Sequence, residues 1–436
     1  MTVQLIGQLG MLALICLVFL RVPVAVAMGL VGFFGYAAIN GFSNALQVTG
    51  QVPYDVATHY TLSQLPLFVL MGDLAVRSGM SSRLYSATRD LFSGLRGSQA
   101  YATLGASAGF GAVSGSSIAT AATMTRVAVP PMKEAKYDDR LSAGSIAAGG
   151  TLGILIPPSI ALVIFAMIAE QSVPRLYAAS LIPGLLLCLL YILVVALLLR
   201  LSPNWAPVDG TRKSLFDRLR SLGQIWEIVL LFLVVIGGLY SGILTATEAA
   251  AVGALGAWLL GVITRRLSWK DTRTGIYDTI RTTAMLFVIL CAANIFTYFV
   301  VLTQIPQGLA ALVDGMDLHP IVLMLLIGVF YLILGCFLEA FGMILITVPI
   351  LMPLVQQAGF DPIWFGIFLV IMIETGMITP PVGMNIFVMQ SQLPDMPLPR
   401  LYQSVLPFVL APVVLSVIII FFPAIVTWLP TLLFER

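Results

Sequence analysis

The sequence has few of the residues that enzymes use for catalysis. Only 10% of its 436 residues are charged, and it contains two histidines and four cysteines. It has no HExxH motif, so it lacks the zinc-binding residues of a zinc protease. It has no GxxxxGK(S/T) phosphate loop, which excludes an ATP-driven pump. The cysteines stand singly in apolar runs, without the spacing of a zinc site or a disulfide framework. We therefore expect no enzymatic activity, no organic cofactor and no nucleic-acid partner.

Apolar residues are what the sequence has in abundance. Hydrophobic residues make up 59% of the chain, and the mean hydropathy is +1.01. Apolar runs of about 20 residues, the length of a spanning helix, recur from Leu5 to the C-terminus. The first run has no basic region before it and Arg21 after it, so we expect a retained membrane helix rather than a cleaved signal peptide. The sequence thus predicts an all-α polytopic membrane protein.

The basic residues predict the orientation of this protein. Lys and Arg in short loops mark the cytoplasmic side, and they cluster in residues 77–96, 133–140, 212–220 and 265–281. Residues 40–60, 303–319 and 356–362 contain none and are predicted to face the periplasm. About ten spanning helices in a bacterial inner membrane satisfy this pattern.

The pattern requires two segments that enter and leave the membrane on the same side. Residues 99–132 are predicted to form a hairpin from the cytoplasm with its tip near 114–117, and residues 319–355 a hairpin from the periplasm with its tip near 339–342. Each hairpin precedes a helix that Gly and Pro-Pro break, at 141–168 and 363–390. A gapless shift of 223 residues superimposes Asp138 on Asp361, Gly153 on Gly376 and Pro157 on Pro380.

These features predict two inverted repeats within four parts of the chain. Residues 1–60 are predicted to be N-terminal scaffold helices, and residues 201–281 to be linking scaffold helices. Residues 61–200 form the first repeat, and residues 282–436 form the second repeat with a C-terminal helix. Matched helix breaks in two halves point to the binding site of a transporter.

The two breaks have a definite chemistry. Each Pro-Pro removes amide donors and frees carbonyls, which at membrane depth must face protein, water or an ion. Hydroxyl, carboxylate and carbonyl oxygens suit a hard cation such as Na⁺, and positive helix N-termini favour an anionic substrate. Small residues could instead serve only close helix packing. We predict a sodium and substrate site in each repeat. The residues of the first site are Ser114, Gly115, Ser116, Ser117, Thr120, Gly150, Thr151, Gly153, Pro157 and Pro158. The residues of the second site are Glu339, Gly342, Glu374, Thr375, Gly376, Thr379, Pro380, Pro381 and Asn385.

Four carboxylates lie in predicted membrane segments, where such groups are costly and usually functional. Glu374 lies in the break itself and is the strongest candidate for a cation or proton site. Glu339 could be a ligand or could tie the hairpin tip. Glu248 is better explained by a helix N-terminus, and Asp73 by an ion pair with Arg77 at helical spacing.

Arg126 and the two histidines are the remaining candidates in the sequence. Arg126 follows the first tip within an apolar arm; snorkelling towards the cytoplasm is favoured, and contact with a substrate carboxylate is the alternative. His59 and His319 fall in predicted periplasmic loops and are expected to have no role.

The motifs SGSSIATAATM (114–124), GTLGILIPPS (150–159), SGILTATEAAAV (241–252) and ETGMITPPVGMN (374–385) closely resemble the large membrane subunit of tripartite ATP-independent periplasmic (TRAP) transporters. The resemblance covers essentially the whole chain. It departs from the family pattern at Glu339, where Asp is usual, and at Arg126, where a small residue is common.

The resemblance implies an elevator-type secondary transporter driven by a sodium gradient, whose mobile domain carries both hairpins and both broken helices. It implies an organic acid substrate, such as a C4-dicarboxylate or sialic acid, delivered by a periplasmic substrate-binding protein. It also implies a small four-helix membrane subunit as a separate partner chain, besides the membrane lipid.

Three alternatives stay open. A stand-alone ion-coupled carboxylate symporter or exporter would transport without a binding protein. An intramembrane enzyme would need catalytic residues that the sequence lacks. A channel would not require paired inverted breaks.

Overall fold

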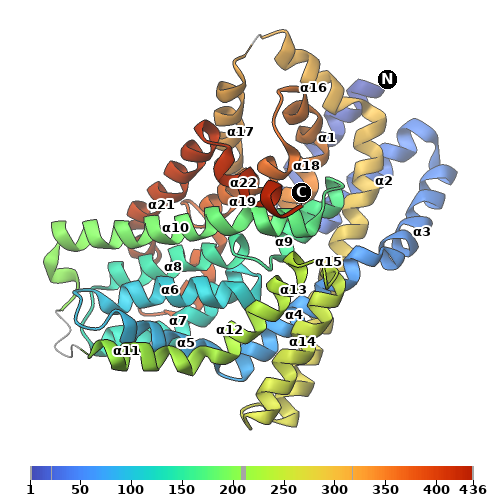
Figure 1. The fold of residues 1–436 in the computed structure, drawn as a ribbon. Helices are drawn as coiled ribbons and strands as arrows, with labels where there is room; N and C mark the ends of the chain where they lie inside the picture. Colours follow the sequence, from blue (N-terminus) through green and yellow to red (C-terminus); the bar gives the residue numbers. More distant parts are fainter. Residues whose placement is uncertain (1, 21, 208–212, 317, 435–436) are drawn as a thin grey trace.

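The computed structural model describes residues 2–20, 22–207, 213–316 and 318–434, so Arg21 and Arg212 lie outside the described residues. Within these ranges the regular structure is helical throughout, without a strand (Figure 1). The predicted all-α fold is therefore confirmed.

One group of helices, which we call the frame, packs around a single long helix. α15 (Trp269–Thr303) contacts α1 (Val3–Phe19), α2 (Val24–Asn40), α3 (Phe42–Thr58) and α4 (Gln64–Arg77), and α4 also packs on α14 (Ala246–Ile263). The backbones of α2 and α15 meet closely, because a Cβ atom on Gly32 would lie 2.7 Å from Phe296 Cα. In Figure 1 the blue α1–α3 lie together with α15 at one side of the molecule.

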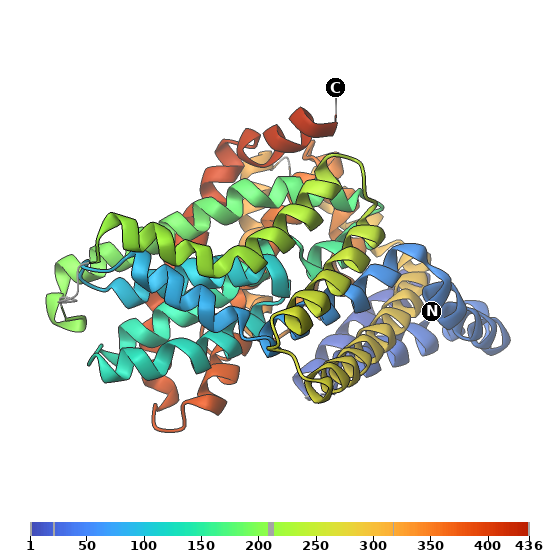
Figure 2. The same cartoon turned by 60° about the horizontal axis from the view of Figure 1, so that its bottom comes forward.

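A second group is layered beside the frame. α6 (Ser98–Ser114) and α7 (Ser117–Glu134) both pack on α8 (Asp139–Leu155), and α10 (Val173–Leu201) lies across α6 and α8. Figure 1 shows these helices beneath the green α10, and Figure 2 shows them set apart from α15 and the N-terminus. The remaining α-helices are α5 (Met80–Leu91), α9 (Ile160–Ile168), α11 (Leu215–Leu222), α12 (Trp226–Phe232), α13 (Gly238–Tyr240), α16 (Ile305–Asp314), α17 (Pro320–Gly335), α18 (Ala340–Gln357), α19 (Pro362–Met377), α20 (Met384–Gln392), α21 (Leu398–Phe421) and α22 (Ala424–Phe434).

Fewer helices than predicted are long enough to span a membrane unaided. Within the described residues, six helices pass by length and composition, and the pair α8 and α9, bent by 43°, makes a seventh. Further apolar helices are shorter, including the 17-residue α1 and α2, and one of the six long helices, α18, is an arm of the second predicted hairpin. The hydrophobic lengths therefore support a multi-pass membrane protein.

Both predicted helical hairpins are present. α6 and α7 meet at Gly115, whose φ of 60° is the left-handed conformation that glycine adopts without strain. The second tip differs slightly from its predicted place: the turn is Cys336–Glu339, so Gly342 lies in the first turn of α18.

The same turn joins each hairpin to its broken helix. Lys136 and Gly359, equivalent under the 223-residue shift, both have positive φ, at 58° and 84°. Asp138 and Asp361 then cap the next helix, and the Oδ1 atom of each accepts a hydrogen bond from the backbone amide two residues on, at 2.8 and 2.7 Å. A hydrogen bond from the Arg140 guanidinium also holds the pKa of Asp138 below its ordinary value. The two repeats thus share the same turn and the same helix cap, although their sequences are only weakly similar.

We expect Asp361→Ala to destabilise the protein by about 1 kcal/mol, because the side chain satisfies two amides at the start of α19. The apparent melting temperature of the purified protein in detergent should fall by a few degrees. Asp395→Ala is the control, since that side chain is 87% exposed and should leave the melting temperature unchanged. Equal effects of the two changes would show that the cap does not stabilise α19.

Candidate functional site

The tip of the first hairpin is a buried cluster of hydroxyl groups. Ser114 Oγ lies 2.9 Å from Thr120 Oγ1, which donates a hydrogen bond to the Ser116 carbonyl at 2.8 Å. Ser116 Oγ accepts from the amide of Ala119 at 3.3 Å and so caps α7. The backbone turn at Gly115 brings these oxygens together at the start of a helix.

The first tip packs directly against the first break. A Cβ atom on Gly153 would lie 2.7 Å from the Ser116 carbonyl and would also overlap Thr120 Oγ1. A Cβ atom on Gly115 would lie 2.9 Å from the Pro158 carbonyl, and Ile160 N donates to the Gly115 carbonyl at 3.4 Å. The residues predicted for the first repeat are therefore brought together.

The interrupted segment lies between α8 and α9. It contains Pro157-Pro158, whose peptide bond is cis, and Ser159 caps α9 by accepting from Leu162 N at 3.3 Å. Before the break, Gly150 faces Ala121 closely. Thr151 Oγ1 lies 2.8 Å from Tyr191 Oη, which ties α8 to α10 at the level of the site.

The second tip meets its break in a similar way. Gly383 N donates to the Cys336 carbonyl at 3.3 Å, and Cys336 Sγ donates to the Pro380 carbonyl at 3.2 Å. A Cβ atom on Gly376 would lie 2.5 Å from Gly335 Cα, as one on Gly111 would lie 2.9 Å from Gly153 Cα. Each hairpin therefore approaches its broken helix through paired glycines.

The polar groups around the second break are largely satisfied within their own helix. Thr375 Oγ1 donates to the Ile371 carbonyl and Thr379 Oγ1 to the Thr375 carbonyl, both at 2.6 Å. Pro380-Pro381 is cis, and the Pro381 carbonyl accepts from Tyr402 Oη. Such hydroxyls retain a lone pair through which they can still contact an ion.

Glu374 lies at the predicted break and connects the two repeats. It lies on α19, two residues before Gly376, and its side chain is also near Ser117 at the first tip and Tyr191 of α10. Its side chain is 2% exposed, and neither carboxylate oxygen has a hydrogen-bond partner among the described residues. An unpaired carboxylate buried in this way requires a proton or a cation.

Two more buried polar groups near α7 are unpartnered within the described part of the chain. They are Ser117 Oγ, at the start of α7, and the Asn385 amide, on α20, which packs on α7. Buried polar groups are nearly always hydrogen-bonded, so an orphaned set requires an explanation. Hydroxyl, amide and carboxylate oxygens are suitable ligands for Na⁺. Ser117, Asn385 and Glu374 supply one group of each kind, so these residues fit such an ion.

Glu339 occupies a different environment. It is half-buried at the N-cap of α18, where its side chain makes no capping hydrogen bond. A Cβ atom on the nearby Gly342 would lie 3.1 Å from Val24 at the start of α2, so the second tip borders the frame. The structure leaves both of its predicted roles open.

The other singled-out charges are mostly explained by structure. Asp73 pairs with Arg77 at 2.6 Å, and Glu248 forms a capping box with Thr245 at the start of α14, as predicted for both. Arg126 is exposed on α7. No ion pair joins it to a described residue, which is compatible with snorkelling and with substrate contact.

The sequence did not reveal the importance of Glu227. Its side chain is 1% exposed and pairs with Arg83 and, at 3.1 Å, with Arg266. Its position after Trp226 at the start of an apolar run was the available signal. The ion triad joins α5 and the α14–α15 connection to α12.

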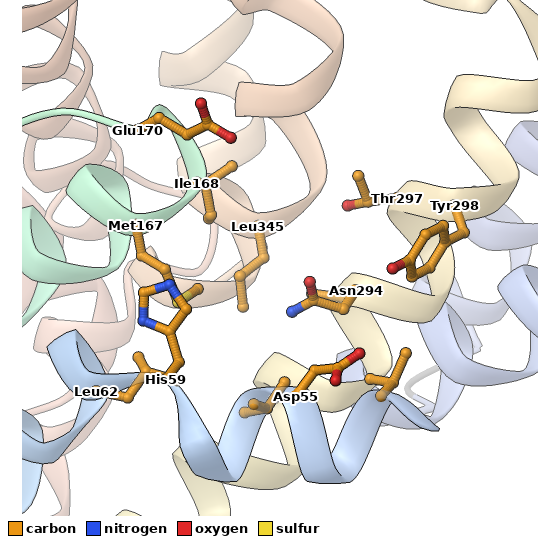
Figure 3. A pocket seen from close by; sticks show the side chains of 13 residues that line it. Asp55, His59, Leu62, Met167, Ile168, Glu170, Asn294, Thr297, Tyr298 and Leu345 are labelled. Carbon is orange, nitrogen blue, oxygen red and sulfur yellow. The ribbon is translucent and has the colours of Figure 1, made fainter. Parts of the chain in front are cut away.

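A cavity of about 250 Å³ with several polar residues in its lining opens between α3 and α15 of the frame and the helices α9 and α18. Figure 3 shows Asp55 of α3 and His59, which directly follows α3, on one side, Glu170 beyond α9 on another, and Asn294 and Tyr298 of α15 on a third. No residue of the predicted sites lines it, and His59, which we expected to have no role, does.

Residues 11–425 match the family described as "Tripartite ATP-independent periplasmic transporter, DctM component". The C4-dicarboxylate TRAP transporter large permease protein DctM of Pseudomonas aeruginosa is 36% identical over 378 residues, covering 86% of this chain and 88% of that protein. The sialic acid TRAP transporter large permease protein SiaM of Vibrio cholerae is 32% identical over 375 residues, covering 86% and 87%.

A solved structure is similar in fold. The YdaH transporter of Alcanivorax borkumensis matches with a TM-score of 0.61, covering 88% of this chain and 89% of that one. The two sequences are 15% identical, so this likeness shows the fold alone.

Proposed function

The chain belongs to the DctM-component family of TRAP transporters, and from that premise we propose that it takes up an organic acid across the bacterial inner membrane by coupling to sodium. As a large permease of this family it is a multi-pass membrane transporter and not an enzyme. The observation that carries the sodium coupling is the buried, unpaired carboxylate of Glu374 beside Ser117.

Sodium is proposed to bind where the two repeats meet. Ser117, Glu374 and Asn385 offer hydroxyl, carboxylate and amide oxygens that have no partner among the described residues. The first tip adds the Ser114 and Thr120 hydroxyls. A cation there would neutralise Glu374 and hold α7, α19 and α20 together, so binding the ion would close the site.

We propose that the hairpins and broken helices move as one body against the frame. Of the frame, α1–α3 and α14 lie in the predicted scaffold, residues 1–60 and 201–281, whereas α4 and the second part of α15 lie in the predicted repeats, residues 61–200 and 282–436. Each tip borders the frame at a glycine: Gly72 of α4 meets Ser114, and Gly342 meets Val24. We propose that these glycine contacts let the tips slide along the frame, as an elevator mechanism requires.

The substrate is proposed to be a C4-dicarboxylate, a sialic acid or a similar carboxylate, because the named relatives transport such acids. A periplasmic substrate-binding protein would deliver it, and a small four-helix membrane subunit would complete the transporter. We propose that the polar cavity in Figure 3 is part of the periplasmic route, since it lies between the frame and the helices that would move. Arg126 is a candidate contact for the substrate carboxylate.

Uptake of a labelled organic acid into proteoliposomes tests this function. We expect uptake to require the small subunit, an inward sodium gradient and the binding protein together. The controls replace sodium with potassium or omit the binding protein. Sodium-driven uptake without the binding protein would support a stand-alone symporter instead, and uptake indifferent to sodium would contradict the coupling.

A further inference from the structure

A groove lies between the α5–α6 connection and the end of α10. It encloses about 700 Å³, and its walls are the apolar side chains of Phe92, Leu95, Ile192, Ala196 and Leu199. The two elements meet tightly beneath it, because a Cβ atom on Gly97 would overlap Leu199. Figure 1 shows the end of α10 beside the start of α6.

Two arginines flank this apolar groove. Arg96 lies in the α5–α6 connection and Arg200 in the last turn of α10, and both are exposed. Neither forms an ion pair or hydrogen bond with the residues that the structure describes, whereas the nearby Lys213 pairs with Asp90 at 2.8 Å. The groove therefore combines two uncompensated positive charges with an apolar interior.

The groove borders an exposed apolar stripe on α10. α10 exposes Leu185, Leu189, Leu193 and Leu197, one residue per helical turn, between 48% and 60% exposed. This stripe runs along the same helix as Ile192 and Ala196 and ends at Arg200. The end of α10 that carries Arg200 is the predicted cytoplasmic end, where anionic headgroups attract basic residues.

We propose that the groove binds one anionic phospholipid of the surrounding membrane. Its phosphate lies between Arg96 and Arg200, where guanidinium groups match phosphate geometry. An acyl chain fills the space along Ile192, Ala196 and Leu199. The occupant is a lipid rather than free phosphate, because the larger part of the groove is apolar and continues into the leucine stripe. The inference is independent of the transported substrate.

Native mass spectrometry of the purified chain tests the proposal. Dioleoylphosphatidylglycerol and dioleoylphosphatidylcholine are each added in detergent, and the bound lipid is counted. The wild type should retain phosphatidylglycerol about tenfold better than phosphatidylcholine. Arg96→Ala with Arg200→Ala should lower phosphatidylglycerol retention to the phosphatidylcholine level. Ala196→Phe, which fills the groove and keeps both charges, should lower retention of both lipids.

The matched control is Arg273→Ala with Arg281→Ala. It removes the same charge from exposed positions of α15 that line no such groove, and it should retain phosphatidylglycerol as the wild type does. Should the double alanine variant fail to fold, the single variants Arg96→Gln and Arg200→Gln should each lose part of the preference. Equal retention of the two lipids by the wild type, or an unchanged preference in the arginine variants, would overturn the proposal.

Discussion

Glu374→Gln is expected to lower the initial rate of sodium-driven uptake by about a hundredfold. The substitution keeps the size of the side chain and removes the negative charge of a carboxylate that is buried beside Ser117 without a partner among the described residues. Removing one charge of a buried pair costs about 3 kcal/mol, which corresponds to about a hundredfold in affinity. The measurement is uptake into proteoliposomes as a function of the external sodium concentration.

Glu248→Gln is the matched control for this substitution. Glu248 is also a membrane-segment glutamate, but its carboxylate caps α14 through Thr245, and uptake should change by less than about twofold. Both variants should assemble with the small subunit and elute as the wild type does. An unchanged sodium dependence in the Glu374 variant would remove this residue from the ion site.

The breaks and the first tip could be predicted because local chemistry decides them. Pro157-Pro158 and Pro380-Pro381 cannot continue a helix, and Gly115 supplies the positive φ that a tight turn requires. The charge pattern then required a hairpin before each break, and both hairpins are present. The predicted role of Glu248 at a helix N-terminus is equally local.

Contacts between the repeats could not be predicted in this way. Glu374 lies in the second repeat by sequence, yet its neighbours are Ser117 and Tyr191 of the first, because α19 packs on α8 and α10. The ion triad of Glu227 likewise joins three elements that are distant in sequence. Helix periodicity and helix breaks determine neither the neighbours of Glu374 nor the ion pairs of Glu227. Both depend on how helices that are distant in sequence pack together.

Gly153→Ala is expected to lower uptake by at least about tenfold and to raise the sodium concentration that gives half-maximal uptake. The added methyl group would lie 2.7 Å from the Ser116 carbonyl and would overlap Thr120 Oγ1, so the tip must move away from the break. Overpacking of this kind costs about 1 to 3 kcal/mol. One of the displaced atoms, Thr120 Oγ1, is a proposed sodium ligand, so we expect the substitution to weaken both ion binding and stability.

Two further variants separate the site from general helix packing. Gly376→Ala, in the second repeat, would place its methyl group 2.5 Å from Gly335 Cα. The second hairpin would have to move away from its broken helix, so this variant should also lower uptake. Gly237→Ala adds the same methyl group where nothing lies within 4 Å, and uptake should be unchanged. If Gly153→Ala behaved like Gly237→Ala, with wild-type sodium dependence, the close contact between the first tip and its break would not be required for transport. If it lowered only the melting temperature, that contact would serve stability, and the sodium site would have to lie elsewhere around Glu374.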